Sequence, residues 1–100
     1  MNKVNKIKED MINYVVKTAE ESKLDVVIYL FGSAIRDDCT EDSDIDLAID
    51  TDLDICDSRL VMLYRNIRRA CDRNCDVIYF PVVSDGAFRD NILKGIRIYG

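Results

Sequence analysis

Residues 31–50 read FGSAIRDDCTEDSDIDLAID, and the interpretation of the whole chain depends on this stretch. Its first residues complete the apolar run 26–31, VVIYLF, whose β-branched and aromatic residues predict a strand covered on both faces. Its last residues, 44–50, alternate between polar and apolar side chains. This alternation predicts a second strand with one buried face. A short acidic connection therefore joins two predicted strands.

Gly32 and Ser33 directly follow the first predicted strand. A glycine allows a ligand to approach the backbone closely. Residues 33–36 could form a short helix with Ser33 at its N-cap, and free N–H groups at a helix start suit phosphate oxygens. An ordinary turn contains the same two residues, so this pair alone leaves both interpretations open.

Asp44 and Asp46 lie two residues apart on the second predicted strand, so both carboxylates project from one face. Adjacent carboxylates repel each other unless a cation lies between them, and Mg²⁺ prefers such oxygen ligands. The simpler alternative is a solvated strand face. Asp76 begins a third predicted strand, and it reaches the first two carboxylates if the two strands are neighbours. Three carboxylates around two metal ions are the arrangement for in-line phosphoryl or nucleotidyl transfer.

The flanking residues alternate between helix and strand patterns. Apolar spacing predicts helices over residues 4–21, from Asp57 or Ser58 to Cys71, and from an N-cap at Ser84 to Gly95. The run 75–80, CDVIYF, forms the third strand, and a short extended tail follows the last helix. We therefore expect one α/β domain over residues 1–100, with a small mixed sheet of three to four strands flanked by helices.

The charge of the chain is unevenly distributed. The net charge of −5 includes ten acids and no base between residues 37 and 57, while the rest carries nine acids and fourteen bases. The negative net charge of the whole chain argues against direct DNA binding. The charged N-terminus lacks the apolar stretch of a signal peptide, and no apolar run is long enough to span a membrane. We expect a cytoplasmic protein.

Histidine is absent from the chain, which excludes Ser-His-Asp and Cys-His catalysis and histidine-bound zinc. No two of the four cysteines have the C-x-x-C spacing of a zinc or redox motif. These cysteines are Cys39, Cys56, Cys71 and Cys75. Acid–base or metal chemistry must therefore come from carboxylates.

The string G-S, ten residues, D-I-D and a distant third aspartate resembles a known family. It is similar to the minimal nucleotidyltransferases (MNT) of the polymerase-beta-like nucleotidyltransferase superfamily, whose members typically read G-S-x-A-R-G and then S-D-I-D-L. The matching residues are Gly32, Ser33, Arg36, Ser43, Asp44, Ile45, Asp46 and Leu47. Asp76 resembles the third carboxylate of the family, and the tail KGIRIYG resembles its usual ending. The resemblance implies the polymerase-beta-like nucleotidyltransferase palm.

The chain departs from the family pattern within the same segment. Ala34, Ile35 and Asp37 replace residues that are usually polar or basic, alanine and glycine, respectively. The loop 37–42, DDCTED, is also more acidic than usual. These departures concern how a triphosphate is held rather than the metal site.

The resemblance also implies roles for the matching residues. Gly32 and Ser33 would bind the β- and γ-phosphates of ATP or another nucleoside triphosphate, and Arg36 would contact a phosphate. Asp44 and Asp46 would hold two Mg²⁺ ions, and Asp76 would share the ion that activates the acceptor hydroxyl.

Minimal members of the family commonly pair with a small helical HEPN protein, an RNase toxin. The resemblance implies an antitoxin that acts as a protein adenylyltransferase and transfers AMP to a toxin tyrosine, with a partner chain or a homodimer completing the acceptor site. Two alternatives remain open. One is a non-catalytic acidic antitoxin that masks a basic toxin surface. The other is a nucleotidyltransferase that modifies a small molecule, as some antibiotic-modifying relatives do.

Overall fold

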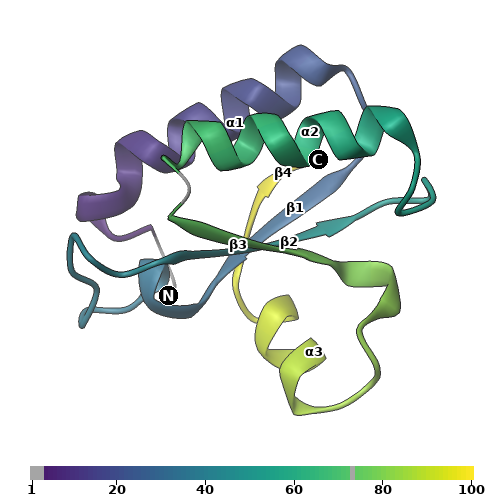
Figure 1. Cartoon of the computed structure of the whole chain (residues 1–100). Coiled ribbons are helices and arrows are strands. Elements are labelled where there is room, and N and C mark those ends of the chain that lie inside the picture. Colours follow the sequence, from purple (N-terminus) through teal and green to yellow (C-terminus); the bar gives the residue numbers. More distant parts are fainter. Residues whose placement is uncertain (1–3, 73) are drawn as a thin grey trace.

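The computed structural model describes residues 4–72 and 74–100, which form a four-stranded mixed sheet with helices on both faces (Figure 1). The strands are β1 (Val27–Phe31), β2 (Ile45–Asp50), β3 (Cys75–Tyr79) and β4 (Ile96–Tyr99), in the spatial order β3-β2-β1-β4. β1 is antiparallel to β2 and β4, whereas β2 and β3 are parallel. The predicted α/β class and small mixed sheet are confirmed, and the extended tail is the fourth strand.

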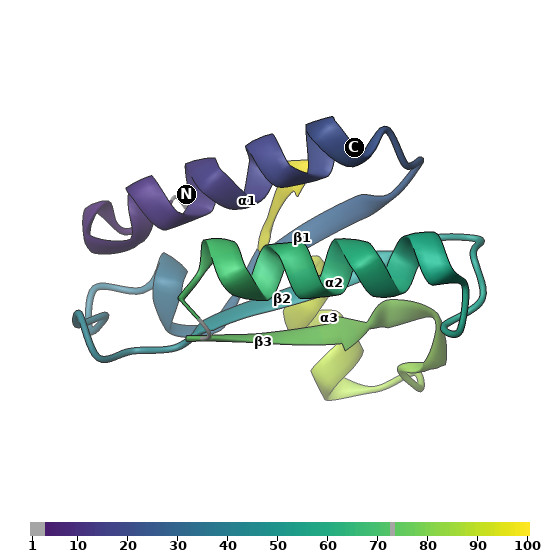
Figure 2. The same ribbon diagram turned by 45° about the horizontal axis from the view of Figure 1, so that its top comes forward.

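Helices α1 (Glu9–Ser22) and α2 (Ser58–Ala70) lie side by side over one face of the sheet (Figure 2). The inward side chains of both central strands meet the apolar stripes of these helices and form the main core. Its fully buried members include Val15, Ala19, Ile28, Leu30, Ile45, Leu47, Ile49, Leu60, Leu63 and Ile67. Each large aliphatic side chain buried there stabilises the fold by about 1.5–3 kcal/mol.

The opposite face carries the short helix α3 (Ala87–Leu93) and a smaller cluster of Phe31, Ala48, Phe80 and Ile92. Phe31 and Ala48 belong to β1 and β2, so α3 covers the middle of this face (Figure 1). At the N-terminal ends of β2 and β3, Asp46 is only half-buried and Asp76 is exposed. The fold therefore leaves the acidic part of this face accessible.

The first helix begins later than predicted. Residues Lys6–Lys8 form a 3₁₀ turn, which starts where the Asn5 side chain accepts a hydrogen bond from the Ile7 N–H, and α1 follows from Glu9. A 3₁₀ turn advances three residues per turn, so it moves Ile7 off the helical stripe. Ile7 is 50% exposed, and the buried stripe begins at Ile12.

The predicted N-cap at Ser84 is wrong. α3 starts at Ala87, preceded by Gly86 with φ 145°, a backbone conformation that favours glycine. Pro81 lies in a further 3₁₀ turn, Phe80–Val82, so the connection after β3 is longer than predicted. Gly95 does follow the helix. A glycine fits this position because a Cβ there would collide with the Leu30 carbonyl oxygen of β1.

Within residues 4–72 and 74–100, no helix is long and apolar enough to cross a membrane.

The packing of α2 gives a stability prediction with an internal control. Leu63 is 1% exposed and its neighbour Met62 is 50% exposed. Leu63→Ala should lower the free energy of unfolding by about 2–5 kcal/mol, because it removes buried methyl groups and leaves a cavity. Met62→Ala should change it by less than about 0.5 kcal/mol, because it alters a surface residue. Urea unfolding measures both, and equal losses would contradict the proposed packing of α2.

Candidate active site

Strand register brings Asp46 and Asp76 together. Asp46 lies on β2 between two neighbouring strands, opposite Phe31 of β1 and opposite Asp76 of β3. Side chains of directly paired residues project from the same face of a sheet. The condition set by the sequence, that the third strand lies beside the second, is therefore met.

Asp46 is the electrostatic centre of this region. Partial burial raises the pKa of its carboxyl above the ordinary value of 3.8, and the negative charges of Asp76 and Asp44 raise it further. The guanidinium of Arg36 acts in the opposite direction. Three other predicted site residues thus act electrostatically on Asp46. A cation among the carboxylates would relieve their repulsion.

Gly32 packs directly against the Asp46 carboxylate. Its φ is +75°, and a Cβ at this position would collide with Asp46 Oδ2. The backbone conformation therefore favours glycine, and a side chain here would displace the Asp46 carboxylate. This contact joins the predicted phosphate-binding turn to the carboxylate at the centre of the site.

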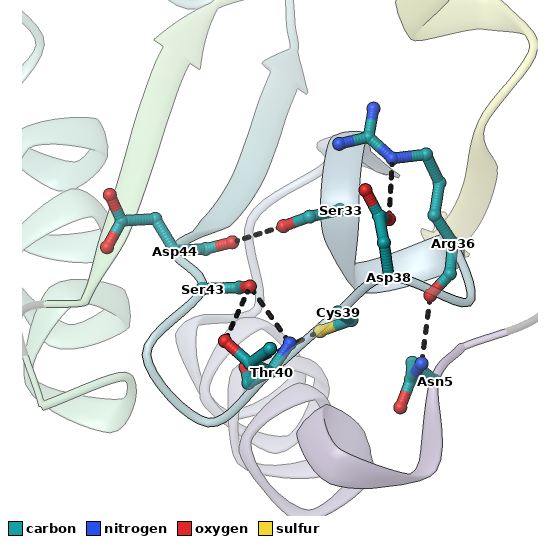
Figure 3. Close-up of polar contacts among 8 residues, drawn as sticks. All are labelled: Asn5, Ser33, Arg36, Asp38, Cys39, Thr40, Ser43 and Asp44. Atoms are coloured by element: carbon teal, nitrogen blue, oxygen red, sulfur yellow. Dashed lines mark hydrogen bonds and ion pairs between the residues drawn. The ribbon is translucent and has the colours of Figure 1, made fainter.

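Ser33 occupies a different position from the predicted one. It lies inside the 3₁₀ turn Gly32–Ile35, whose N-cap residue, Phe31, makes no side-chain capping bond. The Ser33 hydroxyl instead donates a hydrogen bond to the Asp44 carbonyl oxygen at 3.2 Å (Figure 3). The predicted helix N-cap is wrong, but Ser33 connects the turn to the residue that precedes β2.

Asp44 precedes β2 and is exposed, and its carboxylate points away from the Ser33 hydroxyl (Figure 3). In the part of the chain that the structure describes, no three Asp, Glu or Cys side chains are gathered closely enough to hold a metal ion. The three predicted ligands share a region but are not assembled into a ligand set. Their chemistry nevertheless fits Mg²⁺, because every donor is a carboxylate oxygen and Asp44 can rotate freely in solvent.

Arg36 forms an ion pair with Asp38, with Nε 3.1 Å from Oδ1 (Figure 3). Both side chains are largely exposed, so the pair contributes little to stability. The guanidinium charge still reaches Asp46. Arg36 can exchange Asp38 for a phosphate oxygen without disturbing the core.

The cysteines lie outside this site. All four are free thiols: Cys39, Cys71 and Cys75 are buried, and Cys56 is exposed. A hydrogen bond with Cys75, reinforced by burial, raises the pKa of Cys71. This residue therefore stays protonated at neutral pH and behaves as a core side chain.

Sequence patterns did not single out Asn5 and Lys8, which hydrogen-bond to the loop between Ser33 and Asp44. A lysine in an amphipathic N-terminal segment is expected at the surface. Only the tertiary structure shows that Lys8 is buried.

The raised pKa of Asp46 predicts a pH-dependent stability. Because the carboxyl releases its proton at lower pH in the unfolded chain than in the folded one, stability should fall as pH rises through the raised value. Without metal, Asp46→Asn should melt at a higher temperature than wild type at pH 7, and the difference should disappear near about pH 3. Asp50→Asn, on the same strand, is the control. A wild-type melting temperature at or above that of Asp46→Asn at pH 7 would contradict the proposed burial and charge repulsion of the Asp46 carboxylate.

The family model described as "Polymerase beta, Nucleotidyltransferase" matches residues 7–100. A comparison with curated proteins found no match. The matched range includes the turn at Gly32, the three carboxylates and all four strands. By this match the chain belongs to the polymerase-beta nucleotidyltransferase family.

Proposed function

We propose that the protein is a metal-dependent enzyme that transfers AMP from ATP to a hydroxyl acceptor. The observation that carries this proposal is the position of Asp46 between two functionally different neighbours. The turn at Gly32 lies on the β1 side of Asp46, and Asp76 lies on its β3 side. In-line transfer needs the leaving pyrophosphate and the attacking hydroxyl on opposite sides of the reacting phosphorus. The order β1, β2, β3 provides these two sides.

The β1 side suits the triphosphate. Gly32 carries no side chain that would block a phosphate, and Arg36 offers a mobile positive charge. The Ser33 hydroxyl can exchange the Asp44 carbonyl oxygen for a phosphate oxygen as its acceptor. Asp44 and Asp46 would hold two Mg²⁺ ions, and Asp76 would share one of them. Bound Mg²⁺ would neutralise charge on the phosphates and lower the pKa of the acceptor hydroxyl.

The β3 side suits a macromolecular acceptor. β3 is at an edge of the sheet, and Asp76 is exposed near its start. A hydroxyl on a second protein can reach this carboxylate from solvent without entering a closed pocket. Because the chain has no histidine, a carboxylate would have to orient this hydroxyl and its proton. We assign this role to Asp76, which is exposed to solvent.

We further propose that the acceptor is a tyrosine of a helical HEPN-type RNase toxin and that the modification neutralises the toxin. Every helix and strand in residues 4–72 and 74–100 belongs to one sheet fold, so none forms a separate acceptor-binding domain. A partner chain, or a second copy of this chain, would complete the acceptor site. The free cysteines fit a cytoplasmic location.

The exposed acids near the site favour a second candidate function. Asp37, Asp38, Glu41 and Asp42 all face solvent. Such a surface could mask a basic toxin surface without catalysis. Toxin neutralisation that proceeds without ATP and Mg²⁺ would favour this binding function over transfer.

The main test is to co-express this protein with the protein encoded by the gene next to its own, and then to measure the intact mass of that second protein. Wild type should add one or more AMP units to the partner. Asp44→Asn and Asp46→Asn should reduce this transfer to background, because each removes a proposed metal ligand. Thermal melting should show that both variants stay folded.

Asp50→Asn is the matched control, because it removes a carboxylate from the same strand but outside the proposed ligands. It should retain transfer close to that of wild type. Full transfer by either Asp44→Asn or Asp46→Asn would overturn the assignment.

A further inference from the structure

The N-terminal segment holds the acidic loop, defined as residues 36–43, near both of its ends. The Asn5 N–H donates to the Ala34 carbonyl at 2.7 Å, and Asn5 Nδ2 donates to the Arg36 carbonyl at 2.9 Å (Figure 3). Lys8 Nζ donates to the Glu41 carbonyl at 2.9 Å. Figures 1 and 2 both show the start of α1 beside this loop. Residues far apart in sequence are thus joined by three hydrogen bonds.

Lys8 is unusual because its side chain is charged and buried, with only 3% exposed. Burial of an ammonium group costs free energy unless the group finds compensating partners. Its bond to the Glu41 carbonyl is charge-assisted and therefore stronger than a bond between neutral groups. The fold thus buries a lysine at the point where it binds the acidic loop.

The acidic loop connects the turn that contains Ser33 to Asp44. It carries four acids and one base, Arg36, so like charges favour an extended, mobile conformation. Within the loop, the Thr40 N–H donates to Ser43 Oγ at 3.0 Å. The loop then leads directly into Asp44, whose carbonyl accepts the Ser33 bond. The contacts from Asn5 and Lys8 oppose the extension that charge repulsion favours.

We propose that Asn5 and Lys8 are positioning residues for nucleotidyl transfer. They hold the acidic loop, which connects Ser33 to Asp44, in the conformation from which metal and triphosphate would bind. This inference rests on the proposed function. Neither residue needs to touch the substrate: Lys8 is buried, and the Asn5 amide is bonded to the Arg36 carbonyl.

Two variants and one control separate positioning from general stability. Lys8→Met removes the ammonium group but keeps a long side chain. Asn5→Asp keeps an acceptor for the Ile7 N–H and replaces the amide that donates to Arg36. Lys6→Met makes the same charge change as Lys8→Met on an exposed lysine of the same 3₁₀ turn.

The measurement is binding of Mg²⁺ with a non-hydrolysable ATP analogue to the full chain, by calorimetry well below the melting temperature. Lys8→Met and Asn5→Asp should each weaken binding about 10–100-fold, the range seen when a group that orients a metal ligand is lost. Amide hydrogen exchange at Thr40 and Ser43 should rise in both variants. Lys6→Met should match wild type in both measurements.

The possible failures are distinguishable. If both variants fold and bind the analogue as tightly as wild type, the positioning role is overturned and the proposed function stands. A lower melting temperature with unchanged affinity leads to the same conclusion, because it shows a purely structural role. If wild type itself does not bind the analogue, the proposed function fails and this inference fails with it.

Discussion

The packing of the Asp46 carboxylate against Gly32, with Asp76 beside it, is the constraint on which the rest of the structure depends. It places a half-buried acid within electrostatic reach of two other acids, Asp76 and Asp44, so burial and like charge both raise its pKa. Such an arrangement costs stability in a metal-free protein. The two apolar clusters offset this cost, one under α1 and α2 and the other under α3. The site thus contains carboxylates that repel one another, and the well-packed sheet keeps them together.

The order of the strands places different chemical groups on the two sides of Asp46. β1 ends in the turn proposed to bind the triphosphate, β2 carries the central carboxylate, and β3 supplies an exposed acid at the sheet edge. α3 covers the middle of the same face and leaves its acidic end accessible. Family membership and this arrangement both point to nucleotidyl transfer. The acceptor and the toxin partner are proposals that follow from the exposed position of Asp76 and from the family resemblance.

Much of this fold could be predicted because its patterns are local. Alternation placed Ile45, Leu47 and Ile49 on the buried face, and helical spacing placed Leu60, Leu63 and Ile67 in the core. The predicted N-cap at Ser84 was wrong. Gly86 adopts a backbone conformation that favours glycine, and the helix starts after it, at Ala87. The buried state of Lys8 depends on a loop 33 residues away, and no local pattern reports such a contact. Strand register likewise required the structure, although the sequence had already predicted Asp44, Asp46 and Asp76 as candidate ligands.

We propose that Asp44, Asp46 and Asp76 move together to hold divalent metal ions that bind a nucleotide. The most direct measurement is a crystal structure of the protein grown with Mn²⁺ and a non-hydrolysable ATP analogue, with anomalous diffraction locating the metal. Mn²⁺ should be bound to Asp44 and Asp46, with the β- and γ-phosphates beside Gly32 and Ser33. Mn²⁺ bound only elsewhere, for example by the acids of residues 50–57, or a triphosphate far from Gly32, would contradict this proposal.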